Sequence, residues 1–165
     1  MSTTQSARFL PPLRLPHHRE VVGAKLVEVL HDLLALALIG KQLHWMAVGP
    51  LAHSLHLQLD ELVTSWGQLA DEVAERATAL GVSVDGQAAG VSSGSALTPV
   101  APTPVDGTVL LHEITHRVAE VSERARAHLV PVGDLDPVSQ ATLVDVVAAL
   151  EKQQWLLRVQ IDDHT

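Results

Sequence analysis

The sequence contains no cysteine and no tyrosine, and phenylalanine occurs once among 165 residues. The absence of cysteine excludes disulfide bonds, thiolate metal sites and a cysteine nucleophile. Basic residues are also scarce, with 11 lysines and arginines against 19 aspartates and glutamates, for a formal net charge of −8. This balance argues against a basic nucleic-acid surface on the folded body.

The chain also lacks a hydrophobic run long enough to cross a bilayer. The most apolar stretch, VEVLHDLLALALIG from Val27, is interrupted by Glu28, His31 and Asp32. Residues 1–19 have no continuous apolar segment with a small-residue cleavage site, so we expect no signal peptide and a cytoplasmic protein.

The residues that are present favour helices. Hydrophobic residues make up 47% of the chain, and Leu, Val and Ala suit helices better than sheets. The apolar pattern predicts helices over residues 20–46, 50–80, 104–129 and 137–162. The connections are short at residues 48–50, long at 81–103 and short at 131–137. This order predicts an all-α, ferritin-like four-helix bundle domain over residues 20–162 with one crossover, preceded by a flexible arm, residues 1–19. No strand pattern competes, and the crossover has room for a small helical turn.

The stretch HLQLDELVTSWGQLADEVAE, residues 56–75, carries two pairs of metal-ligand residues at helical spacing. His56 and Asp60 are four residues apart, and so are Asp71 and Glu75. Asp60 and Asp71 are separated by eleven residues, which places them roughly 20° apart around a helix axis but about 16 Å apart along it. The two pairs therefore share one face, yet they cannot bind the same metal ion.

A two-fold axis near Ser65 and Trp66 removes this conflict. An antiparallel copy of the same helix from a second subunit would place its position 71 against position 60 of the first subunit, and its position 75 against position 56. Gly67 lies on the same face and would allow a close approach. His44, at the end of the first helix, adds one more imidazole to the first pair. The predicted site takes His44, His56 and Asp60 from one subunit and Asp71 and Glu75 from its two-fold mate. Such a site without thiolates suits Fe(II), Mn(II) or Zn(II).

Three stretches resemble the mini-ferritins of the Dps family (DNA-binding protein from starved cells): KQLHWMAVGPLAHSLHLQLDEL from Lys41, ADEVAERATALG from Ala70 and EKQQWLLR from Glu151. The resemblance implies a hollow shell of twelve subunits built from two-fold dimers. It implies a ferroxidase that oxidises Fe(II) at inter-subunit centres of one or two irons, with hydrogen peroxide or oxygen. The shell would store ferric mineral and protect the cell and its DNA from oxidative damage. All five predicted ligands match those of the family.

The resemblance implies further roles. Trp45 and Trp155 match family tryptophans near the metal centre. For Trp45 two interpretations stay open, an acceptor of a stray oxidising equivalent and a core aromatic. Family iron-entry channels are lined by acids at the start of the last helix. Asp134 and Asp136 fit that pattern, and Asp145 would replace the acid that is missing at Ala141.

Relatives in this family bind DNA through lysine-rich tails, whereas the arm of this chain carries Arg8, Arg14 and Arg19. One such arm would bind DNA poorly, but twelve arms would add through multivalency, with a strong salt dependence. The alternative function is therefore a nucleoid-associated protein whose main role is DNA compaction, with iron chemistry secondary.

One competing motif is HEITH, residues 112–116, which fits the H-E-x-x-H pattern of zinc peptidases. A peptidase needs a third ligand, and the nearby candidates are Glu120, Glu123 and His128. We favour a solvated helix surface over a peptidase, with adventitious metal binding as the remaining interpretation. His17 and His18 are likewise expected to be solvated imidazoles.

Overall fold

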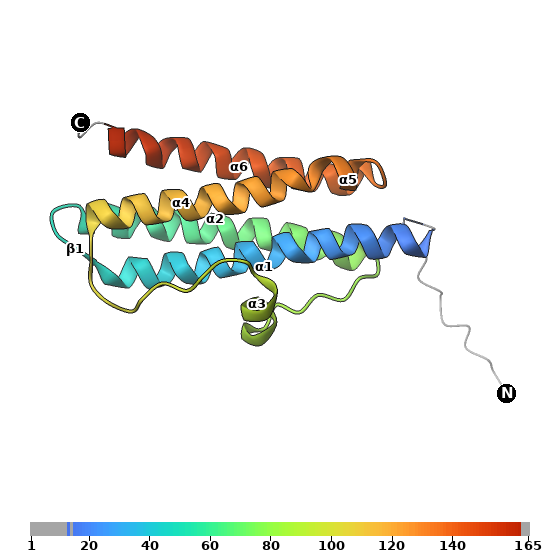
Figure 1. Cartoon of the computed structure of the whole chain (residues 1–165), viewed down its shortest axis with the longest axis horizontal. Coiled ribbons are helices and arrows are strands. Elements are labelled where there is room, and N and C mark those ends of the chain that lie inside the picture. Colours follow the sequence, from blue (N-terminus) through green and yellow to red (C-terminus); the bar gives the residue numbers. More distant parts are fainter. Residues whose placement is uncertain (1–12, 14, 163–165) are drawn as a thin grey trace.

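The computed structural model describes residue 13 and residues 15–162 (Figure 1). Four long helices form a bundle, and two short helices lie in the connections: α1 (Pro16–Met46), α2 (Ala52–Ala79), α3 (Ala88–Gly94), α4 (Gly107–Ala127), α5 (Leu129–Gly133) and α6 (Pro137–Asp162). The all-α bundle with one long crossover is confirmed, and α3 is the small helical turn within that crossover. None of the helices in the described part of the chain combines the length and the apolar character that crossing a membrane requires.

The first helix begins earlier than predicted, at Pro16 instead of about residue 20. Proline is favoured in the first turn because its φ is already helical and its missing N–H has no helical partner there. His17, His18 and Arg19 therefore belong to α1. The rest of the predicted arm, apart from Leu13 and Leu15, lies outside the described residues, and with it Arg8 and Arg14.

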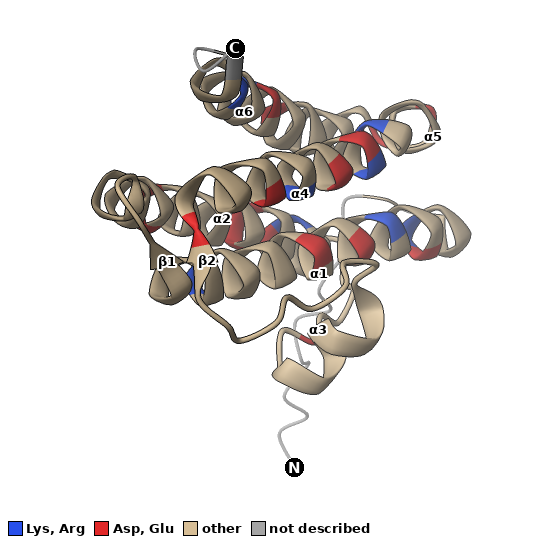
Figure 2. Ribbon diagram, turned by 60° about the vertical axis from the view of Figure 1, so that its left-hand side comes forward, with Lys and Arg blue, Asp and Glu red and all other residues tan. Residues whose placement is uncertain are grey.

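The core lies between the two helix pairs, α1 with α2 and α4 with α6 (Figures 1 and 2). Trp66 is fully buried there, and its indole N–H donates to Gln153 Oε1 at 2.8 Å, which joins α2 to α6. Gly40 faces it from α1, and a Cβ at this position would lie 2.6 Å from Trp66 Cζ3. Glycine thus permits the close packing of α1 on α2 that brings the candidate metal ligands together.

Hydrogen bonds to the buried Asp32 connect the crossover to the bundle. Asp32 in α1 accepts hydrogen bonds from Ser95 Oγ at 2.8 Å and Ala96 N at 3.1 Å, both just after α3. Its other oxygen accepts from Arg124 Nε of α4 at 2.7 Å. A buried carboxylate needs such partners, so this acid sets the path of the connection.

The structure contains a strand pair that the sequence pattern did not predict. β1 (Ala47–Val48) and β2 (Val105–Asp106) pair in parallel. Two residues are too few for an alternating pattern to be recognised. The pairing ties the turn between α1 and α2 to the start of α4, where Asp106 accepts from Thr108 N as the helix cap. Pro50 lies in this turn, before α2, and not within the helix as predicted.

Candidate metal centre

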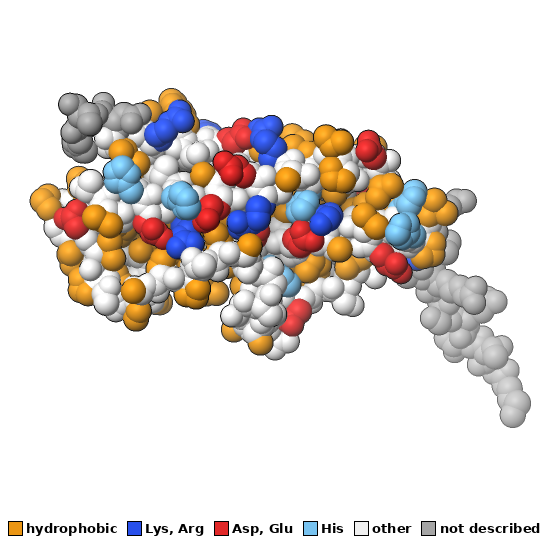
Figure 3. Space-filling view, in the orientation of Figure 1, with side chains coloured by type: hydrophobic (Ala, Val, Ile, Leu, Met, Phe, Trp, Pro, Cys, Tyr) orange, Lys and Arg blue, Asp and Glu red, His pale blue; other side chains and the backbone are white. Residues whose placement is uncertain are grey.

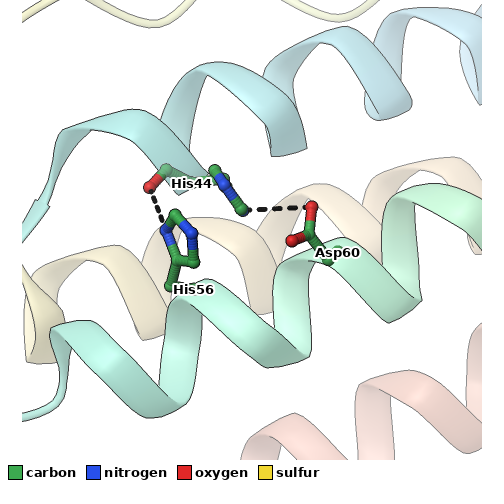
Figure 4. A group of neighbouring side chains, drawn as sticks. All are labelled: His44, His56 and Asp60. Atoms are coloured by element: carbon green, nitrogen blue, oxygen red, sulfur yellow. Dashed lines mark hydrogen bonds and ion pairs between the residues drawn. The ribbon is translucent and has the colours of Figure 1, made fainter.

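The centre forms where α1 ends and α2 begins. His44 is in the last turn of α1, and His56 and Asp60 lie one turn apart near the start of α2 (Figure 4). The short connection returns the chain so that ligand atoms of these three side chains all lie within 4.8 Å of one another. Within the described residues, no other group of three or more histidines, aspartates and glutamates is this close.

His44 is the buried member of this group, with 5% of its surface exposed. Its Nδ1 lies 3.3 Å from Asp60 Oδ1 but has no hydrogen-bond partner in the described part of the chain. The imidazole of His56 packs against that of His44 with ring centroids 3.5 Å apart, and its Nδ1 is 3.2 Å from the His44 carbonyl oxygen. Buried polar atoms are normally paired, so the orphaned nitrogen fits a position that a metal ion would satisfy.

The protonation states suit metal binding. Burial lowers the pKa of His44 below its ordinary value, despite the opposing charge of Asp60. A hydrogen bond from Lys41 lowers the pKa of Asp60, aided by the charge of His44. At neutral pH the pair is therefore a neutral imidazole and a carboxylate, the forms in which these side chains bind metals.

Lys41 is the residue that the sequence reasoning missed. It lies on α1 one turn before His44, and its Nζ donates to Asp60 Oδ1 at 2.5 Å. Its spacing from His44 was visible, but the pairing depends on how α1 packs against α2. The ammonium group compensates the carboxylate charge, so a metal ion must compete with it for Asp60.

Asp71 and Glu75 do not join this group within one chain. Both are exposed on α2, and Asp71 lies about 16 Å along the helix from Asp60 by helical rise. Gly67, between Asp60 and Asp71 on α2, is also exposed, and a Cβ there would meet no described atom within 4 Å. The single chain thus has two candidate ligands, His56 and Asp60, at one end of this face of α2, where His44 of α1 joins them, and two acids at the other end.

The fold agrees with what the chain is similar to. A ferritin-like domain matches residues 23–164. The DNA protection during starvation protein of Agrobacterium fabrum is 30% identical over 150 residues, covering 87% of this chain and 88% of the relative. The crystal structure of Mycobacterium smegmatis Dps superposes with a TM-score of 0.86 at 29% identity, covering 92% of this chain and 93% of that one. The chain belongs to the Dps branch of the ferritin-like family.

A second relative is DNA protection during starvation protein 2 of Deinococcus radiodurans, 32% identical over 133 residues. The match covers 81% of this Dps-type chain but only 55% of that relative's length. Family membership is therefore established, whereas activity and partners have to be argued from the residues.

The tryptophan adjoining the centre is not a core residue of the Dps-type chain. Trp45 is 61% exposed and Trp155 is 53% exposed, whereas Trp66 is fully buried. The core interpretation of Trp45 is therefore wrong for the single chain, because its side chain points out of the bundle. Its role as an acceptor of oxidising equivalents stays a prediction.

Of the predicted channel acids, Asp136 does not offer a free carboxylate. It is 5% exposed and accepts hydrogen bonds from Arg76 Nη2 at 2.7 Å and from Ser139 Oγ. Burial alone would raise the pKa of Asp136, but these bonds hold it below its usual range. This acid caps α6 and ties it to α2. Asp134 and Asp145 are exposed and remain in the channel hypothesis.

The HEITH motif lies on α4 with His112 and His116 both exposed. Glu113, which would serve as the base in a peptidase, accepts instead from Arg117 Nε at 2.7 Å. None of the suggested third ligands joins the two histidines in a close group among the described residues. The geometry therefore gives no support to peptidase activity.

Proposed function

We propose that two copies of this chain form iron-oxidising centres across a two-fold axis. The observation that carries the proposal is the unpaired, buried Nδ1 of His44 beside Asp60, in a ligand group that is incomplete in one chain. An antiparallel α2 from a second copy would bring its Asp71 and Glu75 to this group. The bare surface around Gly67 leaves room for that approach.

Fe(II) enters this reaction as the substrate. His44 and His56 would offer neutral nitrogens, and three carboxylates would balance the added positive charge as Fe(III) forms. With hydrogen peroxide as oxidant, two Fe(II) ions each give one electron, and the peroxide takes both electrons and two protons to become two waters. With dioxygen as oxidant, two Fe(II) ions would each give one electron, and O₂ would take both electrons and two protons to become hydrogen peroxide. The ferric product would then be stored inside a protein shell, which protects the cell from peroxide.

The surface of the chain supports a homo-oligomer. Large apolar side chains are exposed on several helices: Leu38, Trp45, Leu57, Val109, Val130, Val138, Val144, Trp155 and Leu156. Figure 3 shows such side chains spread over one face of the molecule. Extended exposed apolar patches often mark sites where another protein packs. We propose a shell of twelve subunits, the assembly implied by the family resemblance.

Mixing two inactive variants tests the shared centre. Asp60→Ala disables the half that bears the histidines, and Glu75→Ala disables the other half. In a dimer of one chain of each kind, one centre carries both defects and the other carries none. Random co-assembly should therefore restore about a quarter of the wild-type rate of Fe(II) oxidation.

The matched control mixes Asp60→Ala with His56→Ala, which lie in the same half and should restore nothing. If the first mixture stays inactive although both chains co-assemble, the two-fold centre is wrong. If Asp60→Ala alone oxidises Fe(II) at the wild-type rate, the assignment of the ligands is wrong.

DNA protection is the second candidate function, favoured by the name that several relatives share. Weak DNA binding would come from Arg8 and Arg14 of the predicted arm, together with Arg19 in the first turn of α1. A chain lacking residues 1–15 keeps α1 whole. It should lose DNA binding in low salt and keep iron oxidation. Loss of iron oxidation without loss of DNA binding would contradict this assignment.

A further inference from the structure

The exposed face of α4 carries a histidine pair that the proposed iron centre does not use. His112 and His116 are four residues apart, so their side chains project from the same helix face about 6 Å apart at Cβ. This spacing lets two imidazoles hold one metal ion. Both side chains are exposed, so binding requires no opening of the fold. Figure 3 shows histidines together with acidic and basic side chains on this side of the bundle.

Glu120, one turn further along α4, is placed to orient His116. Its Oε2 lies 3.6 Å from His116 Nδ1, is buried and has no hydrogen-bond partner among the described residues. A carboxylate behind one ring nitrogen holds the proton there and leaves the other nitrogen free to bind a metal, and it also makes the imidazole a stronger ligand. Arg117 places a positive charge near this carboxylate, with its Nη1 3.6 Å from the same oxygen.

The same arginine restricts what the pair can do. Arg117 Nε donates to Glu113 Oε1 at 2.7 Å, and Nη1 donates to Thr98 Oγ1 in the crossover at 3.0 Å. Only 12% of the Arg117 side chain is exposed, so the surrounding residues hold its guanidinium group in this position. Glu113 is therefore not available to activate water, and a metal held by the histidines would be bound without hydrolytic chemistry.

We propose that His112 and His116 form a second metal site, in which Glu120 is the outer partner of His116. Two imidazoles with water at the remaining positions favour Cu²⁺, Ni²⁺ and Zn²⁺ over Fe²⁺ and Mn²⁺. The site shares no ligand with the group at His44, and it lies within one chain. It therefore does not depend on the two-fold centre or on assembly.

Metal titration of the full chain tests the site. In a background with His44→Ala and His56→Ala, equilibrium dialysis should find one Zn²⁺ bound per chain. His112→Gln with His116→Gln should abolish that binding, whereas His53→Gln, an exposed histidine of α2, should leave it unchanged. Glu120→Gln should weaken binding by about tenfold, as expected for the outer partner of a ligand.

Electron paramagnetic resonance of bound Cu²⁺ distinguishes a chelate from scattered binding. The background protein should show splitting of the copper signal from two equivalent imidazole nitrogens. Either single variant, His112→Gln or His116→Gln, should show splitting from one imidazole nitrogen. Zn²⁺ uptake that survives in the double variant, or a copper spectrum with one nitrogen in the background protein, would overturn the proposal. Helical circular dichroism of each variant confirms that the fold is retained.

Discussion

Lys41 Nζ and Asp60 Oδ1 are 2.5 Å apart, so an ammonium group lies against the carboxylate that the metal group offers. Both side chains are partly exposed, at 38% and 47%. The pair keeps the single chain free of an uncompensated charge at this position. It also means that metal binding replaces one cation by another.

Replacing Lys41 with Met should strengthen Fe(II) binding, since the metal no longer displaces a bound cation. We expect a gain of roughly two- to fivefold, because partly exposed ion pairs contribute little. Anaerobic titration with Fe(II) measures the affinity. Lys25→Met is the control, because Lys25 forms a similar exposed pair with Glu28 on the same helix. Weaker binding in Lys41→Met would show that the lysine supports the site instead of competing with it.

The pKa of His44 predicts how metal binding depends on pH. Burial lowers this pKa below the ordinary 6.5, so protons compete with the metal only in more acidic solution. Affinity for Co²⁺ should change little through His44 between pH 8 and 7, and it should fall as the pH drops through the lowered pKa of His44, which lies below 6.5. Absorption titrations in a background with His112→Gln and His116→Gln isolate this centre. A steep fall already between pH 8 and 7 would contradict a neutral, buried His44.

Gly40→Ala should destabilise the fold although alanine is the better helix former. The new Cβ would lie 2.6 Å from Trp66 Cζ3 and 2.9 Å from Val63 Cγ2, and the fully buried Trp66 has no room to retreat. Overpacking costs about 1–3 kcal/mol, more than the gain of roughly 1 kcal/mol in helix propensity. Urea unfolding of the dissociated chain measures the change. Gly67→Ala is the matched control and should stabilise the single chain, since its Cβ meets nothing within 4 Å.

Asp136→Ala should destabilise the junction of α2 and α6. It removes a helix cap and leaves Arg76, 15% exposed, without its carboxylate. Breaking a buried ion pair in this way costs about 3 kcal/mol, whereas Asp134→Ala, at an exposed acid, should cost little.

The folded-state pKa of Asp136 is lowered, so its contribution to the free energy of unfolding is present above the ordinary pKa of 3.8 and is lost as the pH falls through the lower folded value. Urea midpoints at pH 7 and in acid measure both effects, and equal midpoints for the two variants would contradict this role.

The fold could be predicted because the signals for it are local. A helix repeats every 3.6 residues through bonds between near neighbours, so the apolar spacing in α1 and α2 and the Gly, Ser and Pro of the crossover show where helices begin and end. The same periodicity placed Asp60 and Asp71 on one face but too far apart for one metal. That conclusion needed only the sequence. The junction of His44 with His56 followed from the shortness of the turn between their helices.

Tertiary structure decided everything that depends on contacts between distant segments. The pairing of Lys41 with Asp60, the burial of Asp136 against Arg76, the exposure of Trp45 and the strand pair at Val48 and Asp106 have no local signature. Each depends on how one helix rotates and slides against another, and that is set by packing across the whole core. The sequence by itself therefore determined which residues are candidate metal ligands, and only the packed structure decided which charged groups lie beside them and which acids stay exposed.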